Sequence, residues 1–576
     1  MIHQIFAACV LSILAFAVAT QVPTLAQEQA PAPAPTSGPP VLQSLEKQLN
    51  LTRAELMDRV VWHIPDPKTD RERASEELKK AGEKLADAYR LRLIELLGAL
   101  TRPTVIRLTL EDAVRRALES SYSIEIERYN PAIENTRVVE AEAAFDATFF
   151  SNLNKNHVDQ PSASQLAATQ FDQFTWNTGV RKALPSGMVV SGSYEFARVD
   201  TTLSFQGLNP EYTSGFVFEM RQPFLRGFGI DYNRSLIVIA QNTRDGSEYQ
   251  FETRVRDTLR EVEFNYWRLV QARRDVVVSA RLLIDFEQIL AFLDARKDFD
   301  VIPVQLAATQ ADLEQARTDF IRAVADVFDA QDRLVAILNS DDINLADEIE
   351  IVPDDFPDLD RVLVDRMAEV QTALANRTEI KQRKTELESA RIVIDRTKNE
   401  ELPVLDFTFR HTIPGLGESA SDSFHDALDR DFTEYLFGLQ FETPIGNRGP
   451  RAAHHRARLQ FAAAAAALKA QYEQVILDVN VAIRRLNTAY DQIAPSLESA
   501  SAREREVESI VARAERKDLN TLINELSARQ QLAASRRSMV AAMVEYNFAM
   551  MDLERAKGTL LQYNNIVIRD ETGKGR

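Results

Sequence analysis

Two short charged turns, 220 residues apart, carry the side chains with the clearest chemical potential. The first reads Arg296-Lys297-Asp298-Phe299-Asp300, and the second reads Arg516-Lys517-Asp518-Leu519-Asn520. Carboxylates such as Asp298, Asp300 and Asp518 can attract cations, but Asp300 and Asp518 can equally cap a helix or complete a turn. Arg296 and Arg516 can pair with such carboxylates or remain solvated charges. The sequence alone leaves both alternatives open at each turn.

The adjacent residues His454 and His455 are the other side chains that could bind a ligand. Neighbouring residues on a helix point in different directions, and no acid or cysteine stands at ligand spacing, so metal binding is not expected. The chain also lacks a phosphate-binding loop, a nucleophile elbow and a zinc motif. We therefore expect no catalytic residue, no cofactor, no metal and no enzymatic activity.

Long helical patterns lie on both sides of each charged turn. From 233 to 297 the chain has no proline and one glycine over 65 residues, enough for a helix of roughly 100 Å. After the first turn, large apolar residues recur every seven positions at Leu306, Leu313, Phe320, Val327 and Leu334. A sustained heptad period predicts supercoiling against neighbouring helices, because one helix cannot bury such a stripe alone.

Strand-like runs precede both long hairpins. The first half has four, at 145–154, 174–182, 188–199 and 212–222, and the second half has two, at 404–411 and 434–443. Alternating stretches of about ten residues with aromatics on one face are typical of a transmembrane β-strand, although a soluble sheet fits them equally well. Beyond the N-terminus no apolar run approaches the ~20 residues of a transmembrane helix, so any membrane crossing must use strands.

Several segments occur twice. The run Phe216 to Pro223 recurs as Phe437 to Pro444, at an offset of 221, and Leu118 to Ile124 matches Leu374 to Ile380 at an offset of 256. The chain is therefore predicted to be internally duplicated. The difference between the offsets places about 35 extra residues in the first copy. They form an additional hairpin around the turn at 185–187, which either joins the sheet or lies in an external loop.

Composition sets the domain boundaries and excludes one class of partner. The formal net charge of −18 should repel nucleic acid. We expect a signal peptide over 1–26, an Ala/Pro-rich linker over 27–41 and a charged helical extension over 42–105. The first repeat then spans 106–340, with strands in 145–222 and a hairpin over 233–340. An acidic connector covers 341–362, the second repeat covers 363–564 with strands in 404–443 and a hairpin over 451–562, and a tail covers 565–576.

The order of these segments resembles the TolC-type outer-membrane efflux protein family. The resemblance covers about 108–564. It rests on the helix start Leu110-Glu111-Asp112-Ala113-Val114, the second-half start Leu374-Ala375-Asn376-Arg377-Thr378, the strand-then-proline joints at Pro223 and Pro444, and Leu519 to Leu526 opening the last helix. The fold class that it implies is mainly α with a β-barrel part. Duplicated coiled-coil hairpins would form a periplasmic tunnel, and the strands would contribute to a trimeric transmembrane barrel.

The resemblance implies a trimeric exit duct of a multi-component efflux or type I secretion system in the cell outer membrane, with most of the chain in the periplasm. It also implies outer-membrane lipid, a periplasmic adaptor and an inner-membrane pump as partners. Physics favours trimerisation independently, because four to six strands per copy cannot close a barrel, and three copies supply 12 or 18. In a trimer, Asp298, Asp300 and Asp518 could ring the periplasmic aperture, held shut by Arg296 and Arg516. The candidate adaptor-docking residues at the tips are Phe299, Val301, Leu519 and Thr521.

Three departures from the family pattern bear on these expectations. Asp298 and Asp518 stand where family members often have glycine, Pro495 should kink the first long helix of the second repeat, and the extra hairpin changes the strand count. A secreted coiled-coil structural protein without a pore is the alternative function. Neither the cargo, the pump class, nor an open or closed resting state follows from the sequence.

Overall fold

The computed structural model describes residues 87–161, 168–202, 206–299, 301–340, 342–513 and 519–568, which all belong to the compact unit Glu76–Arg576. The expected signal peptide, the linker and the first part of the helical extension, 42–86, lie outside the described residues. So do Asp300, Arg516, Asp518 and the end of the expected tail.

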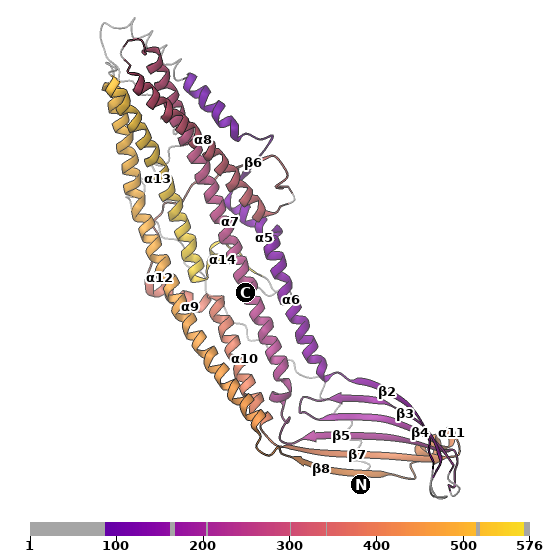
Figure 1. Ribbon diagram of the computed structural model, residues 1–576. Helices are drawn as coiled ribbons and strands as arrows, with labels where there is room; N and C mark the ends of the chain where they lie inside the picture. The colour runs from indigo at the N-terminus through magenta and orange to yellow at the C-terminus, as the bar shows by residue number, and fades with distance from the viewer. Residues whose placement is uncertain are drawn as a thin grey trace. The chain divides into compact units, whose positions relative to one another are not determined.

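Long helices make up most of the described unit (Figure 1). The first repeat contains α5 (Leu110–Ser120), α6 (Tyr122–Glu142), α7 (Ile230–Ala295) and α8 (Pro303–Leu338). The second contains α9 (Arg366–Asn376), α10 (Thr378–Glu400), α12 (Arg448–Arg513) and α13 (Leu519–Lys557), followed by the short α14 (Leu560–Tyr563). Helices α7 and α12 occupy matching positions in the two repeats and have 66 residues each.

Local sequence explains where these helices begin and end. Thr109 caps α5, because its hydroxyl accepts a 3.2 Å hydrogen bond from the Asp112 N–H. Ser121 separates α5 from α6, and Pro131 lies inside α6. Pro303 opens α8, where a missing N–H costs nothing. Pro495 lies inside α12.

Six strands form one sheet in the order β2-β3-β4-β5-β7-β8, with every neighbouring pair antiparallel. The strands are β2 (Thr148–Asp159), β3 (Gln170–Ala183), β4 (Val189–Thr201), β5 (Glu211–Pro223), β7 (Val404–Gly417) and β8 (Glu434–Glu442). The turn at 185–187 joins β3 to β4, and Gly187 there has a φ of 90° that favours glycine. The additional hairpin therefore belongs to the sheet.

Two small elements lie outside the predicted pattern. Strands β1 (Thr104–Leu108) and β6 (Ile349–Pro353) form a two-stranded parallel sheet. The acidic connector predicted over 341–362 therefore contains a strand. Helix α11 (Ala420–Asp429) lies between β7 and β8, and Ser419 caps it by accepting from the Asp422 N–H at 3.2 Å.

The helices pack along two apolar cores. The larger core joins α5, α7, α8 and α13 with β6, and it includes the predicted heptad residues Leu313, Phe320, Val327 and Leu334, while Leu306 is partly buried against it. The smaller core joins α9 and α10 to α12 and α13. Near the sheet the helices neighbour one another in the order α6, α7, α10, α12, and toward the charged turns α7 packs on α8 and α12 on α13.

Part of the expected N-terminal extension is described. Residues 87–97 are helical, and Arg92 pairs with Glu287 of α7 at 2.8 Å. Leu100 is buried in the larger core, and the Arg102 guanidinium lies 4.3 Å from the ring centre of Phe328 on α8. This segment therefore packs against the first hairpin.

Candidate channel wall and helical tips

The first charged turn connects α7 to α8. Arg296 ends α7, its carbonyl accepts from the Phe299 N–H at 3.0 Å, and its guanidinium lies 5.5 Å from the ring centre of Phe292. Asp298 is exposed, and the Phe299 side chain is 86% exposed. Val301 instead packs against the larger core. The turn therefore presents a carboxylate and a large aromatic ring to its surroundings.

The second charged turn falls between α12 and α13, and Arg516 and Asp518 lie outside the described residues. Leu519 begins α13, although its side chain is not described. Close to these helix ends, a polar groove runs between α12 and α13. It is lined by Glu506, Ile510, Thr521, Asn524, Ser527, Ala528 and Gln531. Thr521 is therefore placed in a groove and not at an exposed point.

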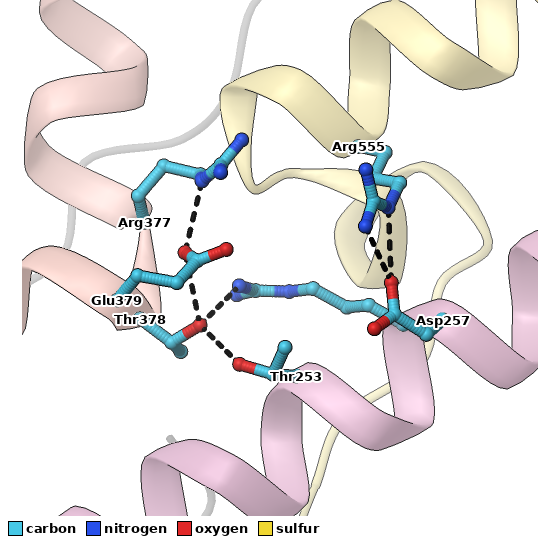
Figure 2. Close-up of a pocket in the computed structure, with 7 residues that line it drawn as sticks. Thr253, Asp257, Arg377, Thr378, Glu379 and Arg555 are labelled. Atoms are coloured by element: carbon cyan, nitrogen blue, oxygen red, sulfur yellow. Dashed lines mark hydrogen bonds and ion pairs between the residues drawn. The ribbon is translucent and has the colours of Figure 1, made fainter. Parts of the chain in front are cut away.

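A cluster of charges joins the second repeat to α7 at the junction of α9 and α10 (Figure 2). Arg377 is only 7% exposed. Its guanidinium donates to Glu379 at 2.9 Å, to Asp478 of α12 at 3.2 Å and to the Ala556 carbonyl near the end of α13 at 3.2 Å. Thr378 links the cluster to α7, because its hydroxyl lies 2.7 Å from that of Thr253. The side chains that line the small cavity here are paired with one another, as expected for residues that hold helices together.

Two carboxyl groups on α7, the buried Glu263 and the largely buried Asp285, have different partners. Glu263 is 3% exposed and accepts from the Asn564 amide at 2.9 Å; burial raises its pKa to about 7, and that hydrogen bond opposes the shift. Asp285 faces Arg529 of α13 at 2.6 Å, and Arg529 also pairs with Glu525. Burial raises the pKa of Asp285, while Arg529 acts against that rise. These groups connect α7 to α13 and to the segment after it.

The six-stranded sheet has one apolar and one polar face, because successive side chains alternate. Aromatic rings form rows across the apolar face, with Trp176 beside Tyr194, Tyr194 beside Phe216, and Phe409 beside Phe437, at centre distances of 5.1–6.0 Å. The same face carries apolar side chains that are more than half exposed in a single copy: Phe149, Leu153, Tyr435, Phe437, Leu439 and Phe441.

The polar face carries ion pairs that cross between strands. Arg410 of β7 reaches over β5 to Glu195 of β4 at 3.1 Å, and Glu195 also accepts from Asn177 of β3 at 3.3 Å. Val217 of β5 lies beneath this bridge and is only 5% exposed, whereas Phe218 on the apolar face is 38% exposed. Arg221 pairs with the buried Asp406 nearer the helices. A charged surface opposite an aromatic one is the arrangement of a membrane channel wall.

Helix α11 packs on the apolar face at the end of the sheet that is remote from the long helices (Figure 1). The Ser423 hydroxyl lies 2.8 Å from that of Ser214, and the Phe424 ring lies 5.8 Å from Tyr194. A Cβ on Gly415 would lie 2.2 Å from the Ser423 carbonyl oxygen. Glycine is therefore required at this position for the helix to approach the strand.

His454 lies where two helices meet. The His454 Nδ1 atom lies 3.3 Å from the Thr397 hydroxyl of α10, which places this residue at a helix–helix contact. Among the described residues, no group of three or more His, Cys, Asp or Glu side chains is arranged to hold a metal ion. Within the same residues, no helix combines the length and apolar character that crossing a membrane requires.

The duplicated helical hairpins and the six-stranded sheet are similar to known proteins. Residues 370–559 match the family described as "Outer membrane efflux protein". No curated protein sequence is detectably similar to the chain. The match and the structural neighbours confirm the resemblance to TolC-type outer-membrane efflux proteins, and the family is one of channels and not of enzymes. The family points to the outer membrane and supports a role as an efflux exit duct.

Solved structures share the fold at low sequence identity. A membrane protein from Pseudomonas aeruginosa is 18% identical, with a TM-score of 0.59, and the match covers 78% of this chain and 93% of that one. The Campylobacter jejuni CmeC outer membrane channel is 15% identical, with a TM-score of 0.57 and coverage of 78% and 86%. The Vibrio cholerae outer membrane protein VceC is 13% identical, with a TM-score of 0.56 and coverage of 78% and 96%. The predicted fold class is thereby confirmed.

Sequence reasoning did not identify Arg377 as a joint, nor α11, nor the bridge from Arg410 to Glu195. A signal for the first was present, because Arg377 lies in the segment that matches Leu118 to Ile124 and stands opposite Ser121 there. An arginine replacing a serine in a repeated helix start marks a position where the two repeats differ in their contacts.

Proposed function

We propose that this protein is the subunit of a trimeric outer-membrane channel that acts as the passive exit duct of an efflux or type I secretion system. The observation that carries the proposal is that the sheet ends in two unpaired strands, β2 and β8, within the described residues. In lipid, such edges leave backbone N–H and C=O groups without partners, at a cost of several kcal/mol for each group. Pairing between copies removes both edges at once.

The helices support the same assembly. The edge helix α6 exposes Tyr122, Ile126, Tyr129 and Ile133, each at least half exposed, at a spacing of four, three and four residues. Such a stripe needs a helical neighbour. The other edge of the same helical layer is α12, so α6 of one copy would meet α12 of the next. Contacts between unlike edges generate a ring when the rotation closes.

In this ring the aromatic face of the sheet contacts outer-membrane lipid and the charged face lines the lumen. The structure describes six strands in the sheet, so three copies contribute 18. Large barrels of this class leave an aqueous channel. The long helices continue the wall into the periplasm, where the tips form the aperture. A soluble structural protein would instead have to cover the aromatic face with other protein.

The helical tips are the surface that contacts the other proteins of the export system. We expect Asp298, Asp300 and Asp518 to supply carboxylates to the aperture of the assembled trimer. Phe299, Val301, Leu519 and Thr521 form the proposed contact with a periplasmic adaptor, which connects the duct to an inner-membrane pump. The exposed ring of Phe299 supports this, because a large aromatic side chain at the centre of a contact often supplies much of its binding energy.

Electron microscopy and electrical recording of the detergent-extracted protein test the proposal together. We expect threefold particles with a long helical shaft, fractionation with outer membranes, and stepwise conductance in planar bilayers. A water-soluble monomer contradicts it, and so does a particle in which its own chain covers the aromatic sheet face beyond the part that α11 contacts.

A further inference from the structure

The two edge strands have compatible directions and lengths. Strand β2 leaves the helical end of the sheet, where the strands join the long helices, and β8 returns to it. A β8 strand beside the β2 strand of another copy is therefore antiparallel, like every pair within the sheet. Strand β2 has 12 residues and β8 has nine, so β8 can pair along its whole length.

Strand ends at the helical end of the sheet are nearly flush. In each of the five neighbouring strand pairs, the paired residues nearest the helices lie within two residues of the end of each strand. Examples are Ala183 with Val189 and Val404 with Glu442. If the closing pair follows the same pattern, Thr148 at the start of β2 lies opposite Glu442 at the end of β8.

The register across the sheet gives an independent check. From Thr148, the paired residues run through Arg181, Ser191, Glu219 and Arg410 to Leu436. Leu436 lies six residues before Glu442 (442 − 436 = 6). Flush closure therefore advances the register by six residues over six strands, or one residue per strand.

This advance fixes the tilt of the strands. With a rise of ~3.3 Å per residue and ~4.8 Å between strands, one residue per strand corresponds to a tilt of roughly 35°. Transmembrane barrels have strand tilts of about 35–45°. Moving Thr148 opposite Gln440 lowers the tilt to roughly 25°. A shift of two residues in the opposite direction places Thr148 opposite Pro444. That residue lies beyond the end of β8 and has no N–H to donate.

The side chains match in the flush register. On the apolar face, Phe149 lies opposite Phe441 and Leu153 lies opposite Phe437, so the exposed aromatic surface continues from one copy to the next. A shift of one residue would set these apolar side chains against Leu436, Gly438 and Gln440, which point to the polar face.

We propose that neighbouring copies close the wall by pairing β2 of one copy with β8 of the next in the register that sets Leu153 opposite Phe437. The inference rests on the proposed assembly of several copies, but it does not depend on their number. It specifies one continuous sheet with six strands from each copy.

Cysteine cross-linking in the full-length protein tests the register. In a Cys9→Ala background, Leu153→Cys is combined in turn with Phe437→Cys, Tyr435→Cys, Leu439→Cys and, on the polar face, Gln440→Cys. Native membranes are treated with a short thiol cross-linker, and covalent oligomers are resolved on denaturing gels. Each single cysteine variant is the control.

We expect the pair at 153 and 437 to form covalent oligomers several-fold faster than the other pairs, with none from single variants. Faster linking with Tyr435→Cys or Leu439→Cys overturns the register while leaving the assembly intact. Threefold particles that link through no pair show that β2 and β8 do not meet, which also overturns the inference. Monomers in every variant contradict the assembly itself.

Discussion

Individual buried polar residues connect helices that are far apart in the chain. Glu263 joins α7 to Asn564, Asp285 joins α7 to Arg529, and Arg377 joins α10 to α12 and α13. Each side chain is removed from water, so its protonation state or its partners decide whether it stabilises the fold.

Glu263→Gln should change how stability depends on pH. Because the pKa of Glu263 is raised to about 7 in the folded protein, the unfolded chain loses this proton first as pH rises. The stabilisation that comes from the neutral carboxyl group is therefore complete below about pH 4.5. As the pH rises to about 7, the free energy of unfolding falls by on the order of 3 kcal/mol. Glutamine keeps the hydrogen bond to Asn564 and stays neutral. Denaturant unfolding between pH 4 and 8 should show a smaller decline for the variant, and parallel curves would contradict this.

Arg377→Met should destabilise the protein by about 3 kcal/mol, because it leaves Asp478 and the Ala556 carbonyl without their buried donor. Arg383→Met, on the helix α10 that follows Arg377, is the matched control. Arg383 pairs with Glu386 at 2.7 Å, but both side chains are more than 40% exposed, so we expect a loss below about 0.5 kcal/mol. Equal losses in chemical denaturation would show that the joint has no special role.

Among the elements, α11 depends on a close approach to the sheet that only glycine permits. Gly415→Ala would place a Cβ 2.2 Å from the Ser423 carbonyl oxygen, so the helix must move away from β7. Trypsin cleavage after Arg430, which ends α11, should become faster. Gly192→Ala on the same face is the control, because its Cβ meets nothing within 4 Å. Similar cleavage rates in both variants would argue against this packing.

For the whole assembly, the prediction concerns the aperture. Asp298→Ala combined with Asp518→Ala removes two carboxylates from each copy, and symmetry repeats the loss around the opening. We expect a higher conductance or a weaker cation preference in planar bilayers. Glu314→Ala, on an exposed part of α8 that pairs with Arg317, is the control and should leave both properties unchanged. Unaltered currents and selectivity in the double variant would show that these two carboxylates do not line the aperture.

Local patterns were sufficient for the long elements of this fold. The predicted helix over 233–297 is observed over Ile230–Ala295, and the predicted strand over 212–222 is observed over Glu211–Pro223. These elements are long and strongly periodic, so neighbouring residues largely specify them. Helix α11 was not predicted, because its ten residues are stabilised by contacts with Gly415 and Ser214, which belong to other elements. The candidate aperture residues remain predictions.

The sequence by itself determined the duplication, the heptad-bearing hairpins, the alternating strands and the resemblance to an outer-membrane efflux channel. The heptads and the alternating strands follow from residue types repeated at short periods, whereas the duplication and the resemblance follow from whole segments that recur and from their order along the chain. Only the tertiary structure decided that the additional hairpin joins the sheet, that Arg410 bridges β5 to reach Glu195, and that Thr378 joins the two repeats through Thr253. Each of these depends on which distant segments lie side by side, and that is fixed by packing and backbone pairing between elements rather than by the pattern within any one of them.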